Sequence, residues 1–304
     1  MIINGDVREV LPTLPDESVD CIITSPPYFQ LRDYGGYSQQ IGNEETYQEY
    51  LSNLVSVFSE CKRILKNDGT MWLNLGDKYE DSNLLMLPAR LAISLQDSGW
   101  YVRNEIIWDK PNAMPNGGKN PLKLDCSHEI IYLMTKQSSG YYFNIDAVKV
   151  KSTSVKPDNR ECGYVRALKY GYNVKSHGDK STGGRFNYNF GGKKYPDNIK
   201  NDRYSGNEYQ PSEYRRLRDV WHINTQPYSG AHFACYPEEL VRRCILAGCR
   251  ESGVVMDCFS GSGTTGKVAY DLGRQYIGIE LNPEYVELSK KRMGNTMQKC
   301  LEGA

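Results

Sequence analysis

Residues 253–280 read GVVMDCFSGSGTTGKVAYDLGRQYIGIE and contain two strand-like segments separated by a glycine-rich run and a helix-like segment. The apolar start of this stretch, from Gly253 to Phe259, predicts a buried strand, and a glycine-rich run from Gly261 to Gly266 follows directly. A helical segment then leads to a second strand, Gln275 to Glu280, which ends in an acid. A glycine turn between strand and helix exposes backbone N–H groups, and the later acid can accept hydrogen bonds from ribose hydroxyls. The stretch therefore indicates a nucleoside-cofactor site.

The glycine loop has three other interpretations. It can be a tight turn that binds no ligand, although the acid at the end of the next strand favours a bound ligand. Its spacing fits an NAD-binding unit, but it begins only about forty residues before the C-terminus, too late for a second half-sheet unless the topology is permuted. Gly261 to Lys267 also fits a phosphate loop, yet Val268 stands where a Ser or Thr would hold magnesium, which disfavours ATP chemistry.

The remaining sequence predicts an α/β fold around this stretch, because strand-like and helix-like segments alternate. Apolar runs predict strands at Val19–Thr24, Met71–Leu75, Trp100–Trp108 and Glu129–Met134. Amphipathic periodicity predicts helices at Thr46–Lys66, with Asp68-Gly69 as a stop signal, and at Leu84–Gln96. Pro237 with Glu238-Glu239 predicts the start of a later helix.

Residues 149–218 interrupt this alternation with a basic, tyrosine-rich composition. They hold 16 Lys and Arg against 7 Asp and Glu, with 8 Tyr and 8 Gly. We expect an inserted lobe there, so that residues 1–148 and 219–304 form the two halves of one catalytic domain.

Ser25-Pro26-Pro27-Tyr28 follows the strand that ends at Thr24. Two prolines stiffen the turn and leave backbone carbonyls without neighbouring donors. Open α/β sheets place substrates at the C-terminal ends of their strands. Alone, such a turn is usually only a stiff loop, but together with the cofactor loop it indicates a substrate site.

Asp257-Cys258-Phe259-Ser260-Gly261-Ser262-Gly263 resembles the D-x-F-x-G-x-G loop of S-adenosylmethionine-dependent amino-methyltransferases. The resemblance implies that Asp257 and the glycine loop hold the methionine end of S-adenosylmethionine, that Glu280 binds the ribose, and that Asp6 faces the adenine amino group. It implies that Phe233 and Pro237 cover the methionine moiety. The cofactor residues that it implies are Asp6, Phe233, Pro237, Asp257, Phe259, Gly261, Gly263, Thr264, Thr265 and Glu280.

The order of the motifs resembles the beta class of DNA amino-methyltransferases, in which the Ser-Pro-Pro-Tyr turn comes first, then a variable lobe, then the cofactor loop. Relatives that act on protein glutamine or ribosomal RNA usually carry Asn-Pro-Pro-Tyr after that loop. The resemblance covers most of residues 1–150 and 219–304. It implies a Rossmann-like, mostly parallel seven-stranded sheet with residues 149–218 as the target-recognition insertion.

The chemistry of amino methylation explains why this turn suffices. The lone pair of an exocyclic amino group is conjugated with the base, and acceptors on its hydrogens can aim it at the methyl group. The resemblance assigns these acceptors to the Ser25 hydroxyl and the Pro26 carbonyl, with Pro27 completing the turn and Tyr28 stacking on the flipped base. Methylation at cytosine C5 needs a nucleophile, usually a cysteine after proline, and the chain has no Pro-Cys pair.

Charge points to DNA only locally, because 37 basic residues balance 37 acidic ones over the whole chain. The basic insertion suits phosphates and bases, although a solvated irregular lobe has a similar composition. We expect double-stranded DNA as the partner, while a companion restriction endonuclease and the oligomeric state are left open. The candidate DNA-binding residues are Arg185, Lys193, Lys194, Arg203, Arg215, Arg216 and Arg218. Trp108 and Lys110 resemble the segment that lines the target pocket.

Other side chains argue against a metal or a secreted protein. The nine cysteines include no pair with metal-knuckle spacing, and the four histidines show no ligand or triad spacing. The N-terminus lacks the pattern of a signal peptide, and no apolar run is long enough to span a membrane, so we expect no metal and a cytoplasmic protein.

The sequence thus predicts a site-specific DNA methyltransferase, with cytosine N4 as the target atom. Cytosine is favoured because relatives with Ser at the position of Ser25 mostly modify cytosine, whereas those with Asp or Asn mostly modify adenine N6. Adenine N6 remains an alternative. A catalytically inactive DNA-binding relative and a permuted NAD oxidoreductase are two others, but every matched catalytic position keeps a workable side chain and no hydride-acceptor site is evident.

Overall fold

A computed structural model describes residues 1–31, 36–37, 39–114, 124–152, 214–226 and 236–302. The chain packs as two compact units, residues 1–149 with 216–304, and residues 150–215. In the second unit the described residues form one antiparallel pair, β8 (Val150–Lys151) with β9 (Tyr214–Arg215). No helix in the described residues is long and apolar enough to cross a membrane.

The first unit is built on an eight-stranded sheet in the order β1-β12-β11-β2-β3-β7-β6-β10. Every neighbouring pair is parallel except the two that involve β7, so the predicted mostly parallel α/β sheet is confirmed. The strands are β1 (Ile2–Asn4), β2 (Val19–Thr24), β3 (Leu65–Leu75), β6 (Tyr101–Asp109), β7 (His128–Thr135), β10 (Val220–His222), β11 (Val254–Asp257) and β12 (Gln275–Glu280). The prediction of seven strands was wrong by one. Short strands such as β10 carry too few residues for periodicity to reveal them.

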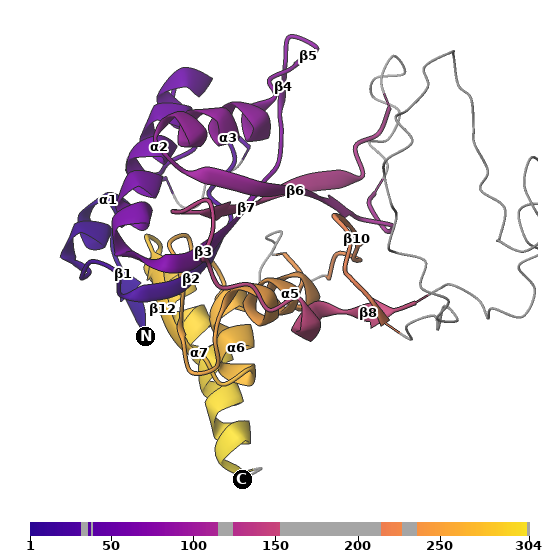
Figure 1. Ribbon diagram of the computed structural model, residues 1–304. Helices are drawn as coiled ribbons and strands as arrows, with labels where there is room; N and C mark the ends of the chain where they lie inside the picture. Colours follow the sequence, from indigo (N-terminus) through magenta and orange to yellow (C-terminus); the bar gives the residue numbers. More distant parts are fainter. Residues whose placement is uncertain (32–35, 38, 115–123, 153–213, 227–235, 303–304) are drawn as a thin grey trace, which may run out of the picture. The chain divides into compact units, whose positions relative to one another are not determined.

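Helices cover both faces of this sheet, as Figure 1 shows, with α2 and α3 on one face and α5, α6 and α7 on the other. They are α1 (Val7–Val10), α2 (Tyr47–Ile64), α3 (Leu87–Asp97), α5 (Glu238–Gly248), α6 (Thr264–Asp271) and α7 (Pro283–Glu302), with 3-10 turns at Leu11–Thr13 and Asp146–Val148 and a hairpin of β4 (Tyr79–Glu80) and β5 (Asn83–Leu84).

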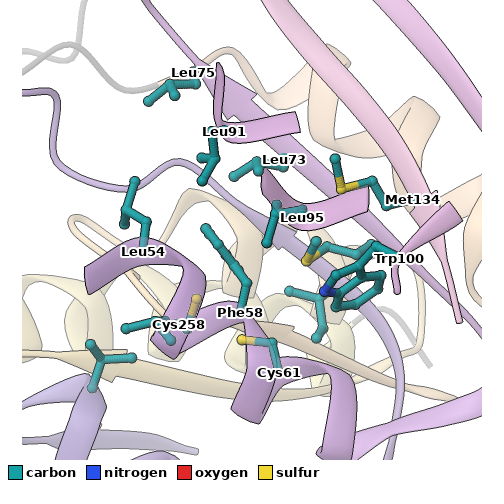
Figure 2. Packing of buried hydrophobic residues seen from close by; sticks show 14 of the residues in the cluster. Leu54, Phe58, Cys61, Leu73, Leu75, Leu91, Leu95, Trp100, Met134 and Cys258 are labelled. Carbon is teal, nitrogen blue, oxygen red and sulfur yellow. The ribbon is translucent and has the colours of Figure 1, made fainter. Parts of the chain in front are cut away.

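The central strands are buried on both faces of the sheet, and their alternate residues belong to two separate hydrophobic cores. Ile22 of β2 joins the core under α2 and α3, whereas its neighbours Cys21 and Ile23 join the core under α5 and α6. Figure 2 shows the first core, where Phe58 of α2 and Leu95 of α3 pack with residues of β3 and β7. Burial of both faces explains why these strands read as continuous apolar runs.

Two predicted helix boundaries were wrong. Helix α2 begins with a capping box, in which Thr46 accepts from the Glu49 backbone and Glu49 accepts from the Thr46 backbone, but it ends at Ile64. Asp68-Gly69 lies inside β3 instead of ending the helix, because β3 starts at Leu65 and its pairing with β2 shifts register before Thr70. Helix α3 begins at Leu87 and not at Leu84, which belongs to β5.

This topology gathers polar segments at one edge of the sheet. The parallel strands β1, β12, β11, β2 and β6 all end there. Strand β7 runs the other way, so its beginning, His128 and Glu129, reaches the same edge. Residues far apart in the sequence therefore meet where open α/β sheets bind ligands.

Candidate active site

A cavity of about 760 Å³ lies at this edge of the sheet. Its wall includes both the glycine loop after β11 and the turn after β2. The volume is in the range of sites for cofactors and drug-sized ligands. The predicted site residues that line it are Asp6, Ser25, Pro26, Pro27, Tyr28, Trp108, Lys110, Phe259, Gly261, Thr264 and Glu280.

The glycine loop has the backbone geometry that its sequence demands. Gly261 and Gly263 have φ angles of 51° and 78°, a left-handed region that favours glycine. A Cβ at Gly263 would lie 2.8 Å from Ser289 Oγ of α7, so glycine also permits the close packing of the loop on that helix. A Cβ at Gly261 would meet only the Phe259 carbonyl, at 4.0 Å, which leaves room for a ligand against the loop.

Glu280 sits at the end of β12, and its carboxylate organises the loop beside it. Gly261 N donates to Glu280 Oε2 at 2.8 Å, and Asn282 N donates to Oε1 at 2.9 Å. Burial raises the pKa of Glu280, and these backbone hydrogen bonds oppose that rise. The side chain also lines the cavity, so an acceptor is available to a ligand hydroxyl.

Asp257, at the end of β11, is buried behind the loop that follows it. Its side chain is 1% exposed and is not among the cavity-lining residues. It accepts hydrogen bonds from Thr24 Oγ1 (2.7 Å), Thr265 Oγ1 (2.7 Å), Tyr236 Oη (2.8 Å) and Phe259 N (3.1 Å). Burial raises the pKa of Asp257, while these four donors act against the rise. The carboxylate ties together segments around the loop.

Tyr236 is a cofactor-end residue that the sequence analysis missed. It lines the cavity, and its hydroxyl contacts both Asp257 and Thr265. The adjacent Pro237, which was predicted, caps the N-terminus of α5 and does not line the cavity. Gly263 and Thr265 lie behind the lining residues, and Phe233 lies outside the described residues.

Asp6 follows β1 and lines the cavity. Its carboxylate caps α1 and accepts from Arg8 Nη2 at 2.6 Å. Burial acts to raise the pKa of Asp6, but hydrogen bonds from the Arg8 side chain and backbone lower it overall. Asp6 is therefore an ionised acceptor near neutral pH.

The turn after β2 forms the other end of the cavity. Tyr50 Oη of α2 donates to the Pro27 carbonyl at 2.8 Å and fixes the turn against the helix. The Tyr28 ring packs on Gly76, where an added Cβ would lie 2.5 Å from Tyr28 Cε2. Its hydroxyl donates to Glu129 Oε2 at 2.7 Å. Ser25 Oγ lies 3.4 Å from the Tyr28 hydroxyl.

Asn74 and Glu129 are two further lining residues that sequence reasoning missed. Asn74 Nδ2 donates to Glu129 Oε2 at 2.8 Å and to Tyr28 Oη at 2.9 Å. Lys110 forms an ion pair with Glu129, and its ammonium lies 4.6 Å from the centre of the Trp108 ring. In the sequence, these two residues could have been noticed as polar residues in strands that are otherwise apolar, Asn74 within β3 and Glu129 near the start of β7.

Four of the predicted DNA-binding residues, Arg185, Lys193, Lys194 and Arg203, lie outside the described residues. Arg215 is in β9 of the second unit. Arg216 and Arg218 belong to the first unit and are not among the residues that line the cavity. His222 Nδ1 lies 2.7 Å from Asp109 Oδ2 at the end of the paired strands β10 and β6.

The observed cavity fits S-adenosylmethionine, with an open glycine loop, an acceptor at the end of β12 and a second at the end of β1. At the other end of the cavity the Ser-Pro-Pro-Tyr turn meets a polar cluster suited to a base. A sheet edge that combines this cofactor loop with this turn defines the class of S-adenosylmethionine-dependent amino-methyltransferases.

Comparison with known proteins places the chain within this class. Residues 19–291 match the N6/N4 methyltransferase family, described as DNA methylase, and the chain belongs to that family. It is a beta-class DNA amino-methyltransferase of the restriction-modification type, and its methyl donor is S-adenosylmethionine.

Curated relatives support the assignment, and a solved structure shares the fold. Type II methyltransferase M.Cfr9I of Citrobacter freundii is 37% identical, over 96% of this chain and 87% of that protein. The DNA adenine methyltransferase YhdJ of Escherichia coli (strain K12) is 28% identical, over 96% of this chain and 82% of that protein. The structure of PvuII DNA methyltransferase (cytosine-N4-specific) is similar in fold, with a TM-score of 0.65 at 20% identity, covering 100% of this chain and 93% of that one.

Proposed function

We propose that this enzyme methylates the N4 amino group of cytosine at a specific site in double-stranded DNA. The observation that carries the proposal is Ser25, which begins a rigid turn in the same cavity as the cofactor loop. The serine distinguishes this turn from the Asp or Asn form that mostly accompanies adenine methylation. The family itself includes enzymes of both kinds, so the choice between the two bases depends on this residue.

In the proposed mechanism, the turn activates the amino group without a covalent intermediate. The Ser25 hydroxyl and the Pro26 carbonyl accept hydrogen bonds from the amino group. These hydrogen bonds direct the nitrogen lone pair toward the methyl donor. The Tyr28 ring stacks on the base, which has been flipped out of the duplex. S-adenosylmethionine, when bound, supplies a methyl group attached to a positively charged sulfur.

At the cofactor end, the proposed roles follow from position. Glu280 accepts hydrogen bonds from the ribose, and Asp6 accepts from the adenine amino group. Phe259, Gly261 and Thr264 line the remaining wall, while Asp257 supports that wall through Tyr236 and Thr265. Since backbone groups and fixed carboxylates need little rearrangement, the site is preorganised for binding.

We assign sequence recognition to the insertion, residues 149–218. Its excess of Lys and Arg suits phosphate contacts, and its tyrosines can pack on sugars and bases. Arg185, Lys193, Lys194, Arg203, Arg215, Arg216 and Arg218 are the candidate contacts.

Mass spectrometry of nucleosides tests the proposal. Unmodified genomic DNA is incubated with the purified protein and S-adenosylmethionine that carries a deuterated methyl group, then digested. Labelled N4-methylcytosine is expected. Labelled N6-methyladenine alone would move the target to adenine and leave amino methylation intact, whereas no labelled base would favour an inactive DNA-binding relative.

A further inference from the structure

Glu129 is a carboxylate in the target end of the cavity that the proposed mechanism does not use. Two other lining carboxylates, Asp6 and Glu280, belong to the cofactor end. Glu129 reaches this edge because β7 is antiparallel to its neighbours, which brings the beginning of that strand beside the ends of the others. Its side chain is 17% exposed, so its charge needs compensation.

Three donors from three different segments meet at this carboxylate. They are the Lys110 ammonium after β6, the Tyr28 hydroxyl after β2 and the Asn74 amide of β3. Each of these side chains also lines the cavity. Glu129 thus joins the segments that would surround a target base. A carboxylate that accepts from three donors is suited to holding them in place.

The hydrogen bond to Tyr28 restricts the ring at its far end. Gly76 lies against one part of the ring, and Glu129 and Asn74 hold the hydroxyl. Burial of the hydroxyl and the neighbouring Glu129 charge raise the pKa of Tyr28, so the phenol remains a donor at neutral pH. With the turn fixed at one end and the hydroxyl at the other, little freedom remains in the ring plane.

The same carboxylate orients the Asn74 amide. Because Nδ2 donates to Glu129 and Tyr28, Oδ1 must point elsewhere. Within the described residues, Oδ1 is buried without a hydrogen-bond partner. Nδ2 also lies 3.4 Å from Ser25 Oγ. A buried, unpaired acceptor such as Oδ1 is costly unless something occupies it, and amide reversal would bring the oxygen against the Glu129 carboxylate.

We propose that Glu129 is a positioning residue for the target base, which holds the Tyr28 ring and the Asn74 amide in the orientations that methyl transfer requires. This inference rests on the proposed role of Tyr28 and holds for cytosine and adenine alike. It assigns Lys110 the task of compensating the Glu129 charge inside the cavity.

A double-mutant cycle tests this inference with Glu129→Gln, Tyr28→Phe and the double variant. Glutamine offers one acceptor oxygen in place of two, and phenylalanine removes only the hydroxyl. Single-turnover methylation of unmodified genomic DNA is measured for each, together with S-adenosylmethionine affinity by calorimetry. We expect each single variant to be slower by about tenfold, the double variant to be no slower than the slower single one, and the affinity for S-adenosylmethionine to change by less than about twofold.

The chain offers a matched control, a second tyrosine–glutamate hydrogen bond that also involves β7. Tyr132 Oη of β7 donates to Glu105 Oε2 of β6 at 2.9 Å, and neither residue lines the cavity. Glu105→Gln and Tyr132→Phe should therefore methylate at the wild-type rate. A similar loss in these controls would show a general effect of weakening the sheet and would overturn the inference.

Other outcomes also overturn it. A wild-type rate in Glu129→Gln does so, as do losses that multiply in the double variant. If Glu129→Gln fails to fold, a wild-type rate in Tyr28→Phe also overturns the inference, and a slow rate with intact cofactor affinity supports it. Tyr28→Ala separates the two proposals, because full activity there would remove the proposed site itself, whereas an inactive Tyr28→Ala with a fully active Glu129→Gln would remove only the role of Glu129.

Discussion

Glu280 at the cofactor end of the cavity and Glu129 at its target end are held in different ways. Glu280 accepts from backbone N–H groups, and burial raises its pKa, whereas the nearby Asp6 is paired with the Arg8 cation. At the target end, Glu129 is paired with the Lys110 cation. Most of the cofactor end comes from the consecutive β11, glycine loop, α6 and β12, with Asp6 and Tyr236 added from elsewhere, while the target end is built from four separate segments. The cofactor end can therefore be recognised as a sequence motif, whereas the target end is formed only when distant segments come together in the folded chain.

The largest expected effect is at the target end. Ser25→Ala and Tyr28→Ala should each lower turnover by about 100-fold or more, because they remove an acceptor or a stacking surface that acts on the flipped base. Filter binding with duplex DNA and calorimetry with S-adenosylmethionine should show affinities near those of the parent. Full turnover in either variant would place the chemistry elsewhere.

The second prediction concerns Asp257 and tests whether its hydrogen bonds stabilise the glycine loop. Asp257→Ala leaves three buried hydroxyls and one backbone N–H without their acceptor, and we expect a loss of about 3 kcal/mol or more in the free energy of unfolding. Asp257→Asn keeps one acceptor and should cost about 1 kcal/mol. Urea unfolding measures both. Equal stability of Asp257→Ala and the parent would mean that the buried cluster does not hold the loop.

The smallest effect concerns a charged cluster beneath the glycine loop. Arg292 Nη1 donates to Thr264 Oγ1 at 3.0 Å, and its Nη2 donates to Glu238 Oε1 at 3.0 Å. Lys267 Nζ also donates to Glu238, at 2.8 Å. Burial acts to raise the pKa of Glu238, but hydrogen bonds from Lys267 and Arg292 hold it below the ordinary value of 4.5.

A lowered pKa gives the sign of the pH dependence. The ionised Glu238 stabilises the fold above pH 4.5, and this contribution is lost as the pH falls through the folded-state pKa. Glu238→Gln should therefore be less stable than the parent by about 1 kcal/mol at pH 7, and the gap should close toward pH 3. Thermal unfolding across this range checks it. A gap that widens on acidification would reverse the sign and contradict the assignment.

The sequence predicted what depends on local pattern. The glycine loop, β12 with its terminal acid and the turn after β2 are each encoded by consecutive residues, and their places follow from parallel strands that end at one edge. Glu129 could not be found in this way, because the hydrophobic periodicity of β7 does not indicate that the strand is antiparallel to its neighbours. The motif around Asp257 could not reveal its hydrogen bonds to Thr24 and Tyr236, because these residues lie far from the motif in the sequence.

Isothermal titration of S-adenosylmethionine into Glu280→Gln and Tyr28→Ala, compared with the parent, tests the division of the cavity most directly. Glu280→Gln should raise the Kd by about tenfold or more, since a charged acceptor at the proposed ribose position is lost. Tyr28→Ala should keep the Kd within about twofold of the parent. An unchanged Kd in Glu280→Gln, or a matching rise in Tyr28→Ala, would contradict the assignment of the methyl donor to the β11–β12 end and of the base to the Ser-Pro-Pro-Tyr turn.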